Sequence, residues 1–421
     1  MRLAPHAEAF CLGSVPMVGN RVTGGLIGLT PEGRALCDEL STRDVAPSEV
    51  PESCRELAEH LARGGYLEDG EKDLDGSVPQ VMSAYLHVTQ RCNLSCRFCY
   101  SEDAGRNALP DPSLPELARA LDLLGGLGAQ RIVISGGEPF LRDDLARLAE
   151  RACEAGIGEV IVLTNGLLVT DEAVAALAGL VSCIAVAFDG PDERSVPHLR
   201  GERRAARLVE AVRAVRDAGI EARVLPTLHG RNLEDQDAYR ELARELGASL
   251  GFSLLTAPIA ELGDYAIGED DLAELGRSVA DGKGGCGDDL LGPGVALAAR
   301  ATCGAGVRTL SVAADGTVYP CHMLHDPALT LGNAFTDPAE KIMGGAVARR
   351  FRSLDARMFD GCGSCDKRVL CGGGCRARAY LSGLGLEGRD PYCELSRSYY
   401  ARLGDLLEQR FMPKGGGQDA V

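Results

Sequence analysis

Ala84-Tyr-Leu-His-Val-Thr-Gln-Arg-Cys92-Asn-Leu-Ser-Cys96-Arg-Phe-Cys99-Tyr100 joins a β-rich run directly to three closely spaced cysteines. The run 84–89 predicts a strand, so the cysteines lie in the loop at its carboxyl end, where parallel α/β folds place their chemistry. Three thiolates fill three corners of a [4Fe-4S] cubane and leave one iron open to an external ligand. A structural zinc ion, the alternative, usually takes four ligands in two close pairs.

The same order of strand and helix repeats through the middle of the chain. Segments of helical period follow the β-rich runs, and crossover helices imply parallel strands. About six units result, too few for a closed eight-stranded barrel. We therefore predict an α/β fold built on a partial, open (β/α)6 barrel. The predicted strands are 84–89, 131–135, 159–164, 183–188, 222–228 and 249–254, and the predicted helices are 114–127, 144–155, 171–180, 204–218 and 234–246.

The flanking sequence predicts further parts. An N-terminal winged-helix-like α+β domain has β-rich runs and helices at 10–22, 25–29, 31–40 and 53–64, followed by a polar linker at 68–76. The Gly- and Cys-rich C-terminal domain is predicted to be organised by metal rather than by a large apolar core, and to end in a helix at 394–411. The predicted division is 1–78, 79–260 (barrel), 261–302 (bridging region), 303–411 (Cys-rich domain) and 412–421 (disordered tail).

Composition limits the classes of function. The net charge of −17 opposes non-specific attraction to nucleic acid or to an anionic membrane, and neither is an expected partner. The chain shows no long apolar run, and its start, MRLAPHAEAFCLG, lacks a signal-peptide pattern, so we expect a cytoplasmic protein. Sixteen cysteines in such a chain indicate metal ligands or redox groups rather than disulfides.

The cysteine triplet followed by Tyr100 resembles the signature of radical S-adenosylmethionine (SAM) enzymes, and motifs similar to the other motifs of that family follow in order. They are Ser135-Gly-Gly-Glu-Pro139, Thr164-Asn165-Gly166 and Phe188-Asp189-Gly-Pro191. The resemblance implies that the triplet holds a [4Fe-4S] cluster and that SAM is bound by Tyr100, Gly136, Gly137, Glu138, Pro139, Asn165, Asp189 and Arg200. Ordinary glycine turns and a surface arginine are the alternatives. Ala187 stands where relatives often have serine.

Seven later cysteines form a second pattern, Cys303-X12-Gly316-X4-Cys321, a gap, then Cys362-X2-Cys365-X5-Cys371-X3-Cys375-X17-Cys393. Seven thiolates can hold up to two further clusters, with zinc as the alternative. The pattern resembles the SPASM extension of radical SAM enzymes. The resemblance assigns Cys362, Cys365, Cys371 and Cys393 to a second auxiliary cluster, and Cys303, Cys321 and Cys375 to a first, with Cys286 as the candidate fourth ligand. The remaining Cys11, Cys37, Cys54, Cys153 and Cys183 are predicted to be small core residues.

His322 follows Cys321, at a position where sulfatase-maturating relatives carry an acidic proton acceptor. A histidine can transfer protons near neutral pH, which makes His322 the candidate catalytic residue. A structural hydrogen bond is the alternative role. The absence of a carboxylate at this position argues against a sulfatase-maturating enzyme.

The N-terminal segment 25–36, with Gly64-Gly-Tyr-Leu67, resembles peptide-recognition elements, which bind a leader peptide as an added strand. A structural cap is the alternative. The resemblances together imply a peptide-modifying radical SAM enzyme with SAM and three [4Fe-4S] clusters, a precursor peptide that carries a leader, and flavodoxin or ferredoxin as electron donor. The implied product is a thioether or other crosslink. Maturation of a folded protein or of a peptide-derived redox cofactor, and a non-catalytic iron-sulfur or zinc-binding module, are the alternatives.

Overall fold

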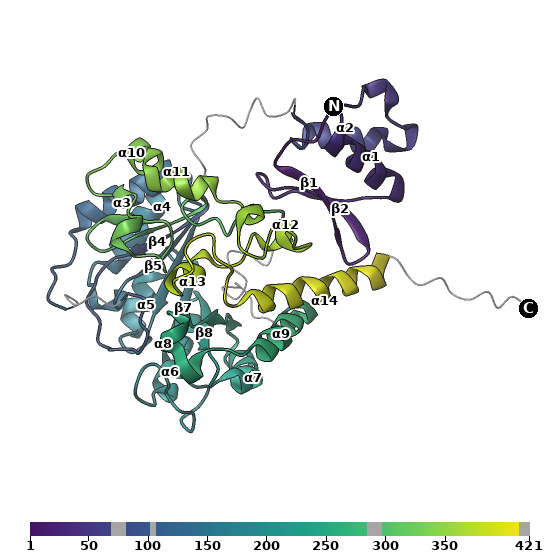
Figure 1. The fold of residues 1–421 in the computed structure, drawn as a ribbon. Helices are drawn as coiled ribbons and strands as arrows, with labels where there is room; N and C mark the ends of the chain where they lie inside the picture. The colour runs from purple at the N-terminus through teal and green to yellow at the C-terminus, as the bar shows by residue number, and fades with distance from the viewer. Residues whose placement is uncertain (69–80, 102–106, 284–296, 412–421) are drawn as a thin grey trace, which may run out of the picture.

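The computed structural model describes residues 1–68, 81–101, 107–283 and 297–411 (Figure 1). Most of the predicted linker 68–76, the whole predicted tail 412–421 and the candidate ligand Cys286 lie outside these residues. Within them, no helix is long and apolar enough to cross a bilayer.

The N-terminal unit is a three-stranded antiparallel sheet covered by two helices, which confirms the predicted α+β character. Helix α1 begins at Pro31 because Thr30 caps it, its side-chain oxygen accepting a hydrogen bond from Gly33 N at 3.1 Å. Leu36 and Leu40 of this helix are buried in the unit's own core. The elements are β1 (Ala7–Leu12), β2 (Val15–Asn20), β3 (Leu26–Gly28), α1 (Pro31–Thr42) and α2 (Arg55–Arg63), in the strand order β1-β2-β3.

The central sheet has parallel strands joined by crossover helices, as the sequence predicts. Three of its strands have the predicted bounds, and the curvature of a partial barrel stays a prediction. The predicted strand 249–254 is two short strands, both paired with β8, because Gly251 and Phe252 leave the ladder and Phe252 is buried beside Tyr239. The strands are β4 (Ser83–His87), β5 (Arg131–Ser135), β6 (Glu159–Thr164), β7 (Cys183–Phe188), β8 (Glu221–Leu228), β9 (Ser249–Leu250) and β10 (Ser253–Leu254).

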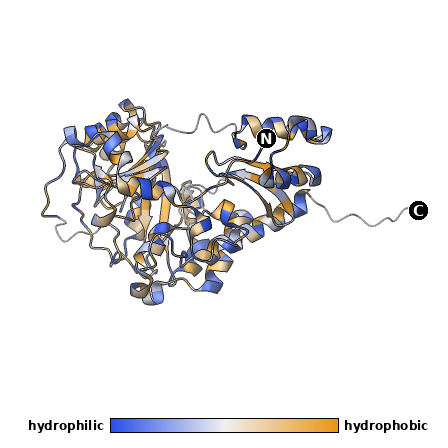
Figure 2. Ribbon diagram, turned by 45° about the horizontal axis from the view of Figure 1, so that its top comes forward, coloured by the Kyte–Doolittle hydropathy of each residue, from blue (hydrophilic) through white to orange (hydrophobic). Residues whose placement is uncertain are grey.

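Helices cover one face of this sheet, and the alternation of each strand divides its side chains between two faces. Ile132 and Ile134 of β5 lie in the main core with the helices, whereas Val133 packs in a smaller cluster with Ile161 and Tyr85. Figure 2 shows hydrophobic residues along the strands of this sheet. The helices are α3 (Leu114–Gly126), α4 (Leu145–Glu154), α5 (Asp171–Leu177), α6 (Ala205–Asp217) and α7 (Gln236–Leu246).

The C-terminal region extends the same sheet, so part of a region predicted to be organised by metal rather than by a large apolar core lies in the main core. Strand β11 (Thr309–Val312) pairs in parallel with β4, and β12 (Thr317–Tyr319) and β13 (Gly332–Asn333) follow antiparallel. Leu310, Val312 and Val318 lie in the main core, so apolar burial holds this part. The other helices are α8 (Ile259–Leu262), α9 (Glu269–Ser278), α10 (Ala339–Gly344), α11 (Ala346–Ser353), α12 (Arg368–Cys371), α13 (Arg376–Leu381) and α14 (Cys393–Phe411).

The N-terminal unit packs against helix α14 (Figure 1). This helix packs along α9, and its outer half lies against β1 and β2. The contact is close at two glycines, since a Cβ on Gly404 would lie 2.8 Å from Gly13 N. Phe10, Leu12 and Met17 are buried in the main core of the chain. The N-terminal unit is therefore packed on the C-terminal region through a shared apolar core.

Of the five cysteines predicted to be core residues, Cys37, Cys54 and Cys183 are buried, but Cys11 and Cys153 are exposed. For these two the prediction is wrong. In β1 the side chains of Phe10 and Leu12 take the buried face, so Cys11 points to solvent.

Candidate active site

The cysteine triplet lies in the loop after β4, and all three thiols are partly buried. Two backbone contacts shape this loop: Cys92 N donates to Asn107 Oδ1 at 2.9 Å, and Arg97 N donates to Leu199 O at 2.8 Å. Phe98, between Cys96 and Cys99, has a positive φ of 59°. A non-glycine residue in this region is strained and persists only where surrounding contacts hold it. Here Phe98 packs beside Leu199 and Tyr265.

The predicted SAM-binding glycines lie against this loop. Gly137 N donates to Thr89 O and Glu138 N donates to Arg91 O, both at 2.8 Å. A Cβ on Gly137 would lie 2.0 Å from Arg91 O, and one on Gly136, whose φ is +126°, would lie 2.3 Å from Thr89 O. The two glycines are therefore required by the close approach of the two loops.

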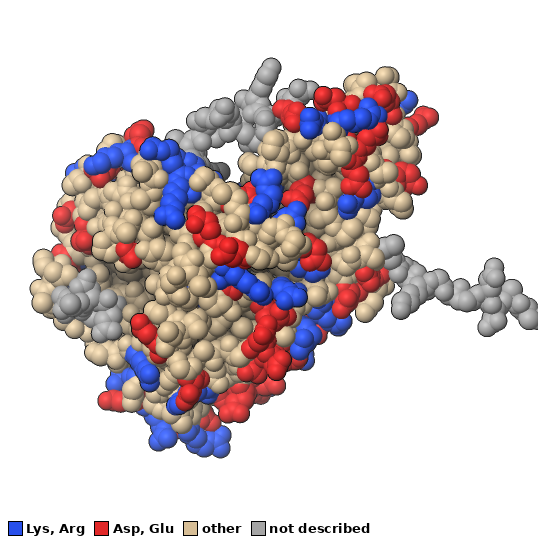
Figure 3. Space-filling model, in the orientation of Figure 1, with Lys and Arg blue, Asp and Glu red and all other residues tan. Residues whose placement is uncertain are grey.

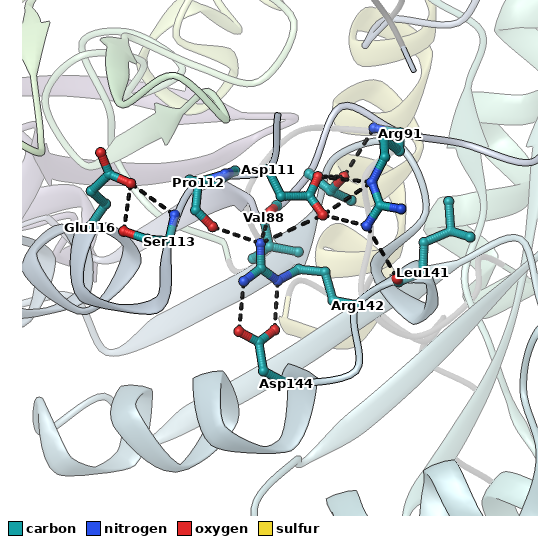
Figure 4. Close-up of polar contacts among 10 residues, drawn as sticks. Val88, Arg91, Asp111, Pro112, Ser113, Glu116, Leu141, Arg142 and Asp144 are labelled. Atoms are coloured by element: carbon teal, nitrogen blue, oxygen red, sulfur yellow. Dashed lines mark hydrogen bonds and ion pairs between the residues drawn. The ribbon is translucent and has the colours of Figure 1, made fainter. Parts of the chain in front are cut away.

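A polar network supports the loop from outside (Figure 4). The Asp111 carboxylate lies between the guanidinium groups of Arg91 and Arg142, and Arg91 Nε lies 3.1 Å from both of its oxygens. Arg142 also donates to Val88 O at 3.0 Å and binds Asp144 at 2.7 Å. Arg91, Asp111 and Arg142 are far apart in the sequence and match no motif, so sequence reasoning missed this network. The network fixes Arg91, the residue before the first cysteine.

The Glu138 side chain is fully buried, and hydrogen bonds engage both of its carboxylate oxygens. Oε1 accepts from Thr164 Oγ1 at 2.7 Å and from Phe140 N at 3.1 Å, and Oε2 accepts from Asn165 N at 2.8 Å. Burial raises the pKa of this carboxyl above its usual value, although the three donors oppose the rise. Glu138 thus joins the loop after β5 to the loop after β6, and its contact with SAM stays a prediction. Pro139 begins the short 3₁₀ turn that follows.

Asn165, Asp189 and Arg200 come from three separate loops and line one pocket, together with Leu94 of the cysteine loop. The Asp189 carboxylate accepts hydrogen bonds from the backbone N of His198, Leu199 and Arg200 at 2.6 to 3.1 Å. Arg200 donates from Nη1 to Phe188 O at 2.9 Å. Asp189 therefore shapes the loop that presents Arg200, and the pocket is an accessible site next to the cysteine loop.

His322 lies on the inner face of the sheet near the triplet. Its ring stacks on Tyr85, with centroids 3.9 Å apart, and meets the Tyr100 ring edge-on at 5.5 Å. Tyr100 in turn shares a 2.8 Å hydrogen bond with Ser135 Oγ. Burial, aided by nearby His325, lowers the pKa of His322 to about 3, so the imidazole is neutral at physiological pH. The structure thus brings His322 close to the predicted SAM-binding residue Tyr100, and its catalytic role stays a prediction.

The four cysteines predicted for the second auxiliary cluster surround one hollow of about 260 Å³. Cys362, Cys365, Cys371 and Cys393 all line it, although they come from four places along 32 residues of chain. Burial raises the pKa of the Cys371 thiol to about 11, so a metal must displace its proton. Four convergent thiols are the donor set that a [4Fe-4S] cluster takes, and this site fits one.

Cys303, Cys321 and Cys375, predicted for the first auxiliary cluster, pack around a second small core. Burial, together with the neighbouring Cys375 and Cys303, raises the pKa of the Cys321 thiol. Their assignment to one cluster stays a prediction. The candidate fourth ligand, Cys286, lies outside the described residues.

Comparison with known families places the two groups of motifs in two families. Residues 86–242 match the model of the radical SAM superfamily, and residues 303–366 match the SPASM iron-sulfur cluster-binding domain. Both domains imply [4Fe-4S] clusters, and the first implies SAM.

Several curated proteins align with most of the chain. Mycofactocin maturase MftC of Mycobacterium ulcerans is 30% identical over 325 residues, which cover 73% of this chain and 86% of that protein. The AdoMet-dependent heme synthase of Methanosarcina barkeri is 28% identical, covering 73% of this chain and 94% of that protein. PqqA peptide cyclase of Gluconobacter oxydans is 28% identical, covering 79% of this chain and 96% of that protein.

Solved structures share the fold. Streptococcus suis SuiB bound to precursor peptide SuiA superposes with a TM-score of 0.60 at 16% identity, over 93% of this chain and 99% of that one. The native anSMEcpe with bound AdoMet and Kp18Cys peptide superposes with a TM-score of 0.64 at 18% identity, over 78% of this chain and 98% of that one. By its family matches and its relatives, the chain belongs to the radical SAM superfamily and carries a SPASM iron-sulfur cluster-binding domain.

Proposed function

We propose that this radical SAM enzyme modifies a ribosomally made precursor peptide and forms a thioether or other crosslink in it. Cys92, Cys96 and Cys99 would hold the cluster, which, once reduced, would supply the electron that cleaves SAM to methionine and a 5′-deoxyadenosyl radical able to take hydrogen from the peptide. The chain's own residues hold SAM in the pocket lined by Asn165, Asp189 and Arg200, next to the cysteine loop. The relatives named mycofactocin maturase and PqqA peptide cyclase support a peptide substrate.

One structural observation carries the proposal: the N-terminal unit packs directly on the segment with the auxiliary cysteines. Glu8 of β1 pairs with Arg368, and Arg368 Nη1 donates to Cys365 O at 3.0 Å. A second ion pair, Arg21 with Asp355 at 2.5 Å, joins the same two parts. A peptide held by the N-terminal unit therefore starts close to the SPASM region.

Strand β3 gives the N-terminal unit an edge that a peptide can extend. Asn20 N donates to Gly25 O and Leu29 N donates to Pro16 O, both at 2.9 Å. Because hydrogen-bonded pairs alternate along antiparallel strands, the N–H of Gly28 points away from β2. Gly28 is exposed, and a Cβ placed on it would meet no atom within 4 Å. A leader peptide added as a fourth strand would accept this hydrogen bond.

The first experiment tests the chemistry. The anaerobically reconstituted chain, reduced with dithionite, is incubated with SAM and the short peptide encoded beside its gene. We expect 5′-deoxyadenosine and a peptide that has lost hydrogen, both by mass spectrometry. Replacing Cys92, Cys96 and Cys99 by alanine should abolish both products, whereas Cys183→Ser, at a buried thiol outside the ligand patterns, should retain them. An unmodified peptide beside abundant 5′-deoxyadenosine would overturn the peptide assignment.

The second experiment tests the β3 edge with a matched pair of variants. Gly28→Pro removes the outward N–H, whereas Gly28→Ala keeps it. Loss of one backbone hydrogen bond should weaken binding of the labelled peptide about tenfold, as measured by fluorescence anisotropy. Equal affinities for the two variants would place the leader elsewhere and favour the structural-cap role for this unit.

Partners and location complete the proposal. We propose flavodoxin or ferredoxin as the electron donor and a cytoplasmic location, where thiols and reduced clusters are maintained. Figure 3 shows basic and acidic side chains interspersed on the face drawn. The predicted division into recognition, barrel, bridging and SPASM domains belongs to this proposal. A leader-independent reaction would instead favour maturation of a folded protein.

A further inference from the structure

A buried ion pair lies between the two groups of auxiliary cysteines. Arg378 of α13 donates from Nε to Asp390 Oδ1 at 2.9 Å and from Nη2 to Oδ2 at 2.8 Å. The Asp390 side chain is 1% exposed and that of Arg378 is 10% exposed. Such a two-point pair fixes both side chains in one orientation.

Asp390 contacts one cysteine from each group. Its Oδ2 accepts a hydrogen bond from the backbone N of Cys375 at 2.6 Å, and its backbone O accepts one from Cys393 N at 2.9 Å. Cys375 belongs to the predicted first auxiliary site, and Cys393 to the second. Asp390 also lines the hollow formed by the four cysteines of the second site. A single residue thus connects the backbones that present the two sets of thiols.

The surrounding chain is built around this carboxylate. Gly374, with a φ of +75°, approaches so closely that a Cβ would lie 2.4 Å from Asp390 Oδ2. Tyr392 N donates to Asp390 Oδ1 at 3.0 Å, and the Arg378 guanidinium lies 5.2 Å from the centre of the Tyr392 ring. Tyr392 extends the contact to the bridging region, because its hydroxyl accepts from Ile267 N at 3.2 Å.

In this buried pair the positive charge of Arg378 lies next to the negative charge of Asp390. The Asp390 carboxylate faces the Arg378 guanidinium and accepts hydrogen bonds from the backbone N of Cys375 and Tyr392, so its charge has a counterion and donors inside the fold. Removing either partner leaves a buried charge without its counterion, which is far more costly than losing an exposed pair.

We propose that the Arg378–Asp390 pair is a positioning unit that fixes the two auxiliary sites relative to each other. The inference rests on the proposed assignment of the SPASM cysteines as ligands and goes beyond the proposed reaction. Neither residue is a catalytic residue. Their role is to hold Cys375 and Cys393 at a set separation, through one side chain and one backbone carbonyl.

The test compares reconstituted full-length chains by iron content and by low-temperature EPR of the reduced clusters. Asp390→Asn and Arg378→Met should lose about one third to two thirds of the bound iron, the share of one or both auxiliary cubanes in a three-cluster chain. The remaining auxiliary signals should change in line shape. Arg378→Lys keeps the charge and should retain more iron than Arg378→Met. The SAM-induced change in the EPR signal of the triplet's cluster should persist in all variants.

Arg277→Met is the matched control. Arg277 is not among the residues that line the hollow, its side chain is 48% exposed, and it pairs with Glu274 on its own helix. Its loss should leave iron content and spectra unchanged. Wild-type spectra for Asp390→Asn and Arg378→Met would overturn the proposal, as would a variant that also loses the SAM-responsive signal, since the effect would then be global. A wild-type chain holding only about four irons would instead overturn the ligand assignment itself.

Discussion

The loop with Cys92, Cys96 and Cys99 and the segment 362–393 with five further cysteines are held by different forces. Backbone hydrogen bonds from Gly137, Glu138 and Arg97 fix the first loop, and its supporting ion pairs join the half-exposed Arg91 (39%) and the buried Arg142 (6%) through Asp111. Buried charges fix the second segment, which encloses two arginines and an aspartate. The first arrangement requires that Gly136 and Gly137 have no side chain. The second requires the particular side chains of Arg376, Arg378 and Asp390.

This difference follows from what each region is built on. The triplet's loop leaves the end of a central strand, so neighbouring strand ends bring backbone groups to it from several sides. The auxiliary segment has short helices and a small core around Phe351, Phe359 and Leu386. Val369, Leu370 and Tyr392 also join the main core, and the buried polar groups between these apolar contacts specify its conformation.

Gly137→Ala should have the largest effect on stability or on SAM binding, because it disrupts the loop that backbone hydrogen bonds hold in place. The new Cβ would lie 2.0 Å from Arg91 O, and backbone on both sides leaves little room to move. We expect a loss of at least about 5 kcal/mol in the free energy of unfolding, or a chain that folds without binding SAM. Chemical denaturation and equilibrium dialysis with SAM measure the two outcomes.

Gly126→Ala is the control for this prediction. Gly126 ends α3, and a Cβ there meets nothing within 4 Å. Alanine is the better helix former, so stability should stay the same or rise by up to about 1 kcal/mol. Similar losses at both glycines would show that the approach of the two loops is not what Gly137 serves.

The sequence predicts the first region well and the second only in part. Short β-rich, apolar runs between turn signals predict β5, β6 and β7 to the residue. The resemblance to the SPASM extension also groups the four cysteines that line the hollow. The extension of the sheet by β11 is not predictable in this way, since a strand of four residues carries no clear period.

Contacts between distant residues are the other part that sequence could not predict. Asp111 and Arg142 meet across 31 residues, and Arg378 and Asp390 meet across a loop, with no spacing that marks either pair. Three glycines in a row, 372–374, suggest close wrapping, and all three have a positive φ. The partner that requires the wrapping at Gly374, the Asp390 carboxylate, becomes visible only in three dimensions.

Arg376→Met should cause the next largest loss of stability, because it removes buried polar contacts from the auxiliary segment. Arg376 is fully buried, stacks 4.2 Å from the Phe359 ring centre and donates to the carbonyls of Leu386 and Gly388 at 2.8 Å and to that of Gly373. Methionine fills similar volume but leaves these carbonyls without donors, at a cost of about 3 to 5 kcal/mol by denaturant titration.

The exposed Arg350 provides the comparison for Arg376. It is 54% exposed and lies 3.7 Å from Glu387, so Arg350→Met should cost less than about 1 kcal/mol. If Arg376→Met were equally mild, apolar packing rather than buried polar contacts would hold the segment.

A fall in pH should reduce stability by less than the substitutions of Gly137 and Arg376. His229, after β8, is fully buried, and its Nδ1 accepts from Arg231 N at 3.1 Å. Burial, aided by nearby His198, lowers its pKa from 6.5 to about 4. Below pH 6.5 the unfolded chain takes up this proton first, so stability falls until about pH 4, by up to about 3 kcal/mol. The lowered pKa of Asp390 acts only further into acid, because its contribution is complete above its unfolded value of 3.8.

Hydrogen exchange followed by mass spectrometry at pH 7 and pH 5 compares the protection of the end of β8 with that of the auxiliary segment. Between these values the end of β8 should lose protection, while the peptides around Arg378 and Asp390 should keep it. In His229→Asn the stability curve should be flatter across this range, because one proton-binding difference between folded and unfolded chains is gone. Parallel curves for the variant and the wild type would assign the acid sensitivity to other buried imidazoles, of which His325, with a pKa lowered to about 4 by burial, is the first to examine.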